Sequence, residues 1–299
     1  MGDRAKGVLS ILASALGFSV MAACVRLADD FGPALPAIQK SFFRNAVAAV
    51  LAAAMFAREW RARPAGSKPR APRSAIPLLA ARSVLGTIGI FANFYAISHI
   101  PLGDAAMLNK LAPFCTVLFS WLFLSERIGG RQLAAVAGAF AGAMLVVKPS
   151  FAFAEAAPAF AGLVGGVAAG GAYTCVRALG VRKVDGTLII LVFSVFSTVA
   201  ALPFIAIDHV PMTAAQVATL FGAGLGALVG QFGITAAYRF AAARDLAAYD
   251  YSNVVFSALF GLFLFGQTPD LLSWLGFAVI FFMAFVMNRA SNNRQRSAK

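Results

Sequence analysis

The feature that most constrains this chain is a series of ten apolar segments that fall into two groups of five. A helix that crosses the core of a bilayer needs about 20 apolar residues. The chain supplies such stretches at 7–28, 36–57, 76–98, 103–125, 131–148, 160–180, 187–207, 213–238, 246–266 and 270–288. Their apolar runs are continuous rather than alternating, which favours helices over the strands of a membrane barrel. We therefore predict an all-α polytopic membrane protein with ten transmembrane helices.

The second half of the chain repeats the first. The stretch Asp104–Glu126 has a counterpart of equal length in Asp245–Gln267, and Cys24–Arg26 is echoed by Cys175–Arg177. Five spans per repeat place the two halves in opposite orientations, an arrangement found in many secondary transporters, with the substrate site between the halves. We predict a first five-helix repeat at 1–150, a second and inverted repeat at 151–290, a central cavity between them, and a basic tail at 291–299.

The net charge of +13 reflects where the basic residues lie. If both termini are cytoplasmic, most of the 25 Lys and Arg residues fall on the cytoplasmic side, above all in the loop 58–75 and in the tail. The opposite loops carry acidic residues such as Asp29, Asp30 and Asp208. This asymmetry follows the positive-inside rule and predicts a bacterial-type inner (plasma) membrane with both termini inside. Membrane lipid headgroups are then the expected partner of the basic loop, and no nucleic-acid partner is expected.

The sequence lacks the patterns of an enzyme or a metalloprotein. The three cysteines lie within apolar segments at spacings that fit no metal site or disulfide framework. The two histidines, His99 and His209, lie at predicted helix ends without a nearby nucleophile pattern. We expect no enzymatic activity, no cofactor and no metal. Ten helices can enclose a cavity within one chain, so both a monomer and a homodimer remain open.

Charged side chains inside the spans are expensive in lipid and therefore mark candidate functional positions. They are Lys40, Arg44, Arg82, Lys110, Arg177 and Asp250. Arg82 and Arg177 lie close to predicted inner helix ends, where we expect their side chains to reach the interface. Lys110 instead lies roughly 10 Å below the outer start of its helix. Arg44 is similarly deep in the second span.

Pro113 predicts a helix break beside Lys110. A proline has no N–H to bond the carbonyl four residues back, so the carbonyl of Asn109 is freed next to an amide and an ammonium group. Such an opening is tolerated in a membrane helix only where protein, water or ligand satisfies it. Two interpretations remain open: a substrate-binding site, or a kink capped by a neighbouring helix with Lys110 reaching toward solvent.

The internal repeat pairs this break with an acidic and aromatic element. In the register of the two stretches, Asn109 and Lys110 fall opposite Asp250 and Tyr251. Lys110 or Arg44 would bind a carboxylate and Asp250 an ammonium, so the set could hold a zwitterion. Asp250 lies nearer the inner side than Lys110, so it could instead titrate a proton or act as an inner gate. Further predicted substrate-binding residues are Tyr95, Tyr173 and Gln231.

Two glycine ladders predict close helix packing. Glycines recur at every fourth position in the sixth and eighth spans: Gly162, Gly166, Gly170, Gly222, Gly226 and Gly230. Small residues at this spacing clear one face of a helix, so that two backbones can approach each other. The same face could also slide during a conformational change.

Several segments resemble the EamA-type carriers of the drug/metabolite transporter superfamily. The resemblance rests on Phe43-Arg44, on Met107–Pro113 leading into Trp121–Arg127, and on the ten-span layout. Gln267 departs from the pattern, because a Glu commonly ends that segment, as Glu126 does in the first half. The resemblance implies a basket of ten helices around a cavity that opens alternately to each side, and export of small metabolites. The aromatic amino acid exporters are the most similar branch.

We therefore predict a secondary transporter that exports amino acids, aromatic or other neutral ones, and similar small metabolites by alternating access. An alternative is an efflux pump for cationic amphiphilic drugs, which would need a buried acid without a paired base. A non-transporting membrane scaffold is a third interpretation, in which replacing Lys110 would have no effect.

Overall fold

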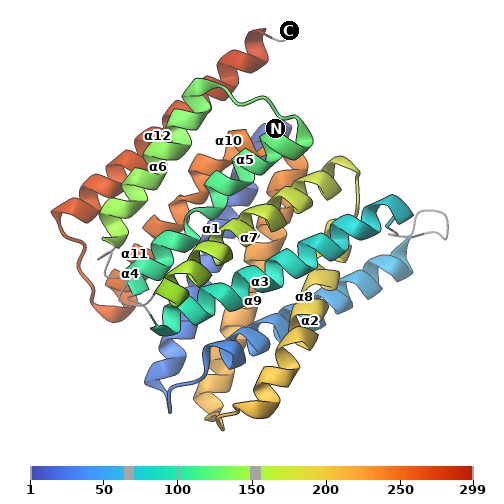
Figure 1. Ribbon diagram of the computed structural model, residues 1–299, viewed down its shortest axis with the longest axis vertical. Helices are drawn as coiled ribbons and strands as arrows, with labels where there is room; N and C mark the ends of the chain where they lie inside the picture. Colours follow the sequence, from blue (N-terminus) through green and yellow to red (C-terminus); the bar gives the residue numbers. More distant parts are fainter. Residues whose placement is uncertain (1, 64–70, 100–101, 149–155, 298–299) are drawn as a thin grey trace.

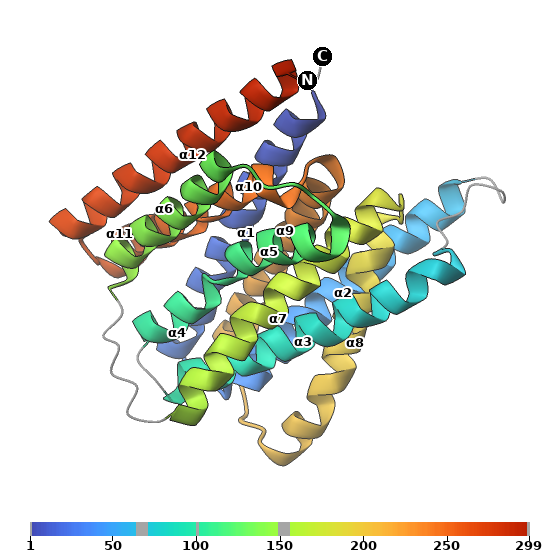
Figure 2. The same ribbon diagram turned by 45° about the horizontal axis from the view of Figure 1, so that its top comes forward.

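The computed structural model describes residues 2–63, 71–99, 102–148 and 156–297, which form a bundle of helices without strands (Figures 1 and 2). The helices are α1 Asp3–Asp30, α2 Ala37–Ala62, α3 Ile76–His99, α4 Leu102–Asn109, α5 Ala112–Leu124, α6 Gly130–Val147, α7 Ala156–Val181, α8 Gly186–Ile207, α9 Ala214–Phe240, α10 Ala243–Asp250, α11 Ser252–Phe265 and α12 Leu271–Ser297. A 3-10 turn, Arg73–Ala75, precedes α3.

The ten predicted spans are confirmed to within a few residues. Ten helical stretches of the described chain are long and apolar enough to cross a membrane, with α4 and α5 forming one broken span and α10 and α11 another. The last helix is longer than the predicted span 270–288, because α12 continues through residue 297 into the segment predicted as the basic tail. The predicted boundary between the halves at 150/151, residues 64–70 of the basic loop and residues 298–299 of the tail lie outside the described residues.

Helices from the two halves pack against each other in matched pairs. α1 packs along α9, and α3 packs along α7. α6 lies beside α12, and α2 against α8 (Figures 1 and 2). In a two-repeat chain α1 is equivalent to α7 and α3 to α9, so the α1–α9 contact is equivalent to the α3–α7 contact. The other two contacts, α6–α12 and α2–α8, each join two equivalent helices. This is the pairing that a two-repeat architecture predicts. The opposite orientation of the repeats in a membrane stays a prediction.

The distribution of apolar side chains is that of a protein surrounded by lipid. Large side chains such as Phe123, Phe263 and Leu271 are exposed, whereas much of the buried core consists of alanine. A soluble monomer rarely exposes so much contiguous apolar surface. In a bilayer the same side chains contact acyl chains, and small residues let the helices pack closely.

The two glycine ladders lie at helix crossings between the halves. In the α9 ladder, a Cβ added at Gly226 would lie 2.8 Å from the carbonyl oxygen of Gly17 on α1. In the α7 ladder, a Cβ at Gly166 would lie 2.2 Å from the carbonyl oxygen of Leu108, the residue before the end of α4. The α7 ladder therefore lets the broken span pack directly on a continuous helix.

Candidate functional site

Two broken helices meet at the centre of the bundle. α4 ends at Asn109 and α5 begins at Ala112, while α10 ends at Asp250 and α11 begins at Ser252. The hydroxyl of Tyr251, at the second break, donates a hydrogen bond of 3.0 Å to the carbonyl oxygen of Lys110 at the first. The two breaks thus occupy equivalent positions in the repeat register, and one satisfies a backbone carbonyl of the other, as an opening in a membrane helix requires.

Lys110 is held inside the protein. Its ammonium donates to the Oδ1 atom of Asn253 on α11. Asn253 in turn donates to the Oγ atom of Ser19 at 2.8 Å and to the carbonyl of Ala15 at 3.1 Å, both on α1. A lysine from the first half is therefore bound to a helix of the second half. The side chain of Lys110 therefore points into the protein and not toward solvent; its role in substrate binding stays a prediction.

A cavity of about 690 Å³ extends from the helix breaks toward the end of the bundle where α1 joins α2. It is lined by the predicted substrate-binding residues Arg44, Asn109, Lys110, Tyr173, Gln231 and Asp250, together with Pro113. Asp250 and Lys110 therefore face one space, although their predicted depths differed. The reason is that α10 begins at Ala243, three residues before the predicted start of this span at 246. Asp250 therefore lies seven residues, and not four, from the start of its helix.

Arg82 is a functional candidate that the sequence prediction placed wrongly. Its side chain does not reach the inner interface; it is 2% exposed and lines the cavity. Its Nη2 atom donates to Oε1 of Gln231 at 3.0 Å, and the guanidinium lies 3.9 Å from the centre of the Phe193 ring, a cation–π contact. Gly86, Gly89 and Asn93 share this lining face of α3 at a spacing of three or four residues, a helical pattern that could have located it.

Arg44 lies in the same cavity and is 6% exposed. Arg82 lines the same cavity, so the two positive charges face one space. The Nε atoms of both arginines are buried without a hydrogen-bond partner. Neither arginine forms an ion pair within the part of the chain that the structure describes.

The mouth of the cavity carries a second set of polar residues. Lys40 and Asp29 form an ion pair with a separation of 2.5 Å. The guanidinium of Arg26 stacks on the Phe265 ring at 4.5 Å. Gln267 turns its amide oxygen toward Arg26 and accepts two hydrogen bonds of 2.8 and 2.9 Å from it. Gln267 therefore binds Arg26 through an uncharged amide, whereas the equivalent Glu126 forms an ion pair with Arg177.

Two predicted substrate-binding residues lie outside the cavity lining. Tyr95 is 46% exposed and its ring lies 4.3 Å from that of His99. It follows Phe94, which does line the cavity, and one residue turns a helix by about 100°. Tyr251 is fully buried, where it satisfies the carbonyl of Lys110 instead of facing the cavity.

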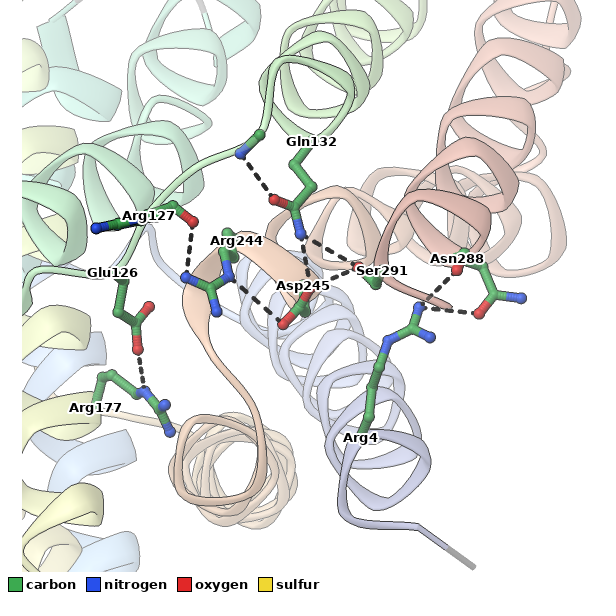
Figure 3. Close-up of polar contacts among 10 residues, drawn as sticks. Arg4, Glu126, Arg127, Gln132, Arg177, Arg244, Asp245, Asn288 and Ser291 are labelled. Carbon is green, nitrogen blue, oxygen red and sulfur yellow. Dashed lines mark hydrogen bonds and ion pairs between the residues drawn. The ribbon is translucent and has the colours of Figure 1, made fainter. Parts of the chain in front are cut away.

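The opposite end of the bundle is closed by a polar cluster near both termini (Figure 3). Arg177 pairs with Glu126 at 2.7 Å and donates to the carbonyl of Tyr238, so its predicted extension to the interface is replaced by an ion pair. Beside it, Asp245 accepts hydrogen bonds from Gln132 on α6 at 2.8 Å and from Ser291 on α12 at 2.5 Å. None of these residues lines the cavity.

The arrangement can bind a small polar molecule. The cavity combines aromatic walls with charges of both signs. Binding pockets of about 300–1,000 Å³ accommodate metabolite-sized ligands. No group of three or more potential metal ligands occurs among the described residues.

Comparison with known proteins points to transport. The profile of the EamA-like transporter family matches residues 5–148. The pseudopaline exporter of Pseudomonas aeruginosa (strain UCBPP-PA14) is 33% identical over 95% of this chain and 96% of its own length. A riboflavin transporter of Rhizobium johnstonii is 29% identical over 72% of this chain and 71% of its own. A crystal structure aligns with a TM-score of 0.77 at 18% identity, covering 92% of this chain and 96% of that one, which shows a shared fold.

Proposed function

The chain belongs to the EamA-like transporter family, and we propose that it is a secondary transporter that exports amino acids and similar small zwitterionic metabolites by alternating access. Its relatives include named transporters of small molecules, among them exporters of pseudopaline and transporters of riboflavin. The observation that carries the zwitterion assignment is the cavity at the two helix breaks, where Lys110 and Asp250 face the same space.

The proposed binding mode follows from the placement of the charges. The ammonium of Lys110 binds the carboxylate of the substrate, and the carboxylate of Asp250 binds its ammonium, because ionised partners give the strongest hydrogen bonds. Tyr173 and Phe193 form part of the wall that contacts the substrate side chain. Cationic amphiphilic drugs fit this cavity poorly, since basic residues outnumber acidic ones along its lining.

The proposed transport cycle uses the two ends of the bundle in turn. The conformation described has its mouth between α1 and α2, which the positive-inside pattern places outside the cell. The Glu126–Arg177 pair closes the cytoplasmic end. Substrate leaves outward from this conformation. To bind the next substrate from the cytoplasm, the cytoplasmic end opens and the mouth, where Arg26 and Gln267 lie, narrows.

Counterflow in proteoliposomes tests this function. Vesicles loaded with one unlabelled amino acid at a time are diluted into the same labelled amino acid, without an ion gradient. We expect the wild type to accumulate label above protein-free vesicles and Lys110→Ala to lose that accumulation. Lys148→Gln, a change of surface charge near α12, serves as the control that retains it. Failure of every amino acid to exchange through the wild type would refute the substrate class.

A further inference from the structure

The charges inside the cavity do not balance. Five basic and two acidic side chains line it: Arg26, Lys40, Arg44, Arg82, Lys110, Asp29 and Asp250. Lys40 and Asp29 neutralise each other at the mouth, and Arg26 is held by Gln267. The interior therefore presents three cations to a single carboxylate.

The excess charge is concentrated in two arginines that the protein leaves without counterions. Arg44 and Arg82 are at least nine-tenths buried, and each has an unpartnered Nε atom. Burying a charge costs free energy unless it is paired, and two like charges that face the same cavity add to that cost. Within the described chain, no acidic side chain lies within ion-pair distance of either.

A carboxylate bound between the two guanidinium groups would pair with both and offset one of their two positive charges. We propose that Arg44 and Arg82 form an anion subsite, and that the transported substrate is an amino acid derivative with at least two carboxylates and a net negative charge. This inference rests on the proposed transport function and narrows its substrate class. Guanidinium groups match carboxylates through planar, paired hydrogen bonds.

The number of carboxylates follows from the charges. A neutral amino acid brings one carboxylate and one ammonium, which satisfy one cation and Asp250 and leave two of the three cations uncompensated. A second carboxylate compensates a further cation. In the proposed mode one carboxylate lies between Arg44 and Arg82, the other at Lys110, and the amine at Asp250.

Gly86 leaves the space that the guanidinium of Arg82 occupies. A Cβ added at Gly86 would lie 2.2 Å from Nη1 of Arg82 and 2.7 Å from the ring of Phe193. Both distances are shorter than real Cβ contacts, so both the guanidinium and the Phe193 ring would have to move. Gly86→Ala therefore displaces the arginine without removing its charge, and separates positioning of the guanidinium from the mere presence of a cation.

Competition by isosteric pairs tests the proposal. Glutamate and glutamine have almost the same shape and differ by one carboxylate, and each is added as competitor in the counterflow assay. We expect glutamate to compete about tenfold more strongly, the effect of one charge-assisted hydrogen-bonded contact. Equal competition by the two would overturn the proposal. Stronger competition by O-phosphoserine than by glutamate would overturn the assignment to carboxylates.

Variants locate the effect. In Arg82→Gln and in Gly86→Ala, we expect the preference for glutamate over glutamine to fall toward one, while Lys148→Gln keeps it. An unchanged preference in both cavity variants would refute the subsite. The rise in unfolding temperature of the purified wild type, larger with glutamate than with glutamine, checks the same preference without any variant. If glutamine and glutamate exchange equally well, the proposed amino acid transport stands and only the subsite fails; if no amino acid exchanges, the proposed substrate class fails as well.

Discussion

Adding a single methyl group at Gly166 should disrupt the contact between α7 and the first helix break. The new Cβ would lie 2.2 Å from the carbonyl oxygen of Leu108, a backbone atom that cannot rotate away. Restoring even a short contact of 3.0 Å requires α4 and α7 to separate locally by at least 0.8 Å. Overpacking of this kind costs about 1–3 kcal/mol, and alanine returns at most about 1 kcal/mol through its helix propensity. With the full helix-propensity gain subtracted, we expect Gly166→Ala to be destabilised by up to about 2 kcal/mol.

A glycine of the other ladder provides the matched control. At Gly222 an added Cβ would approach Sγ of Cys24 on α1 at 3.3 Å and no other atom of a neighbouring helix within the described chain. Gly222→Ala should therefore be neutral or slightly stabilising. Thermal unfolding of both variants in the same detergent compares their stabilities, and counterflow reports whether Lys110 is displaced. Equal stability of the two variants would show that the ladder on α7 does not hold the broken helix.

Three further predictions concern single polar contacts. Tyr251→Phe removes the buried hydroxyl that satisfies a carbonyl of the first break, and should lower the free energy of unfolding by about 1 kcal/mol; no change would mean that water replaces it. Arg177→Ala leaves the carboxylate of Glu126 unpaired and only 12% exposed, which should cost about 1–3 kcal/mol, between the values for exposed and buried pairs. Adding Glu126→Gln to the same chain should restore part of that loss, and a double-mutant cycle without coupling would contradict the assignment. Hydrogen bonding to Lys148 lowers the pKa of Asp270, just before α12, from 3.8 to about 2. Its stabilising effect should be complete above pH 4 and disappear as the pH falls to about 2; unfolding temperatures of the wild type and Asp270→Asn that fail to converge at low pH would refute this.

The sequence predicted the features that depend on local patterns. Long apolar runs are sufficient to place membrane helices, because the bilayer sets their minimum length. The first helix break was visible because Pro113 removes a backbone donor. The break at Tyr251 has no proline and was not predicted, although Tyr251 lies in register with Lys110. A helix break in one half of a repeat is therefore a reason to examine the matching position in the other half.

The features that were missed depend on tertiary contacts. The depth of Arg82 was measured from a helix end, which says nothing about the direction of its side chain or about Gln231 and Phe193 as partners. Asn253 gave no signal, because a single asparagine in a membrane helix does not reveal that it accepts from Lys110. Tyr95 was assigned to the cavity on residue type, although the neighbouring Phe94 occupies that face.

The central claim, that substrate binds in the cavity beside the helix breaks, is tested most directly by protection of a cavity cysteine. Cys24, Cys115 and Cys175 are replaced by alanine, and a single cysteine is introduced at position 109, which lines the cavity. A second variant carries its single cysteine at the exposed position 130. We predict that saturating glutamate slows the reaction of cysteine 109 with a small thiol reagent and leaves cysteine 130 unaffected. An unchanged rate at position 109, in a protein that still exchanges glutamate, would contradict the account.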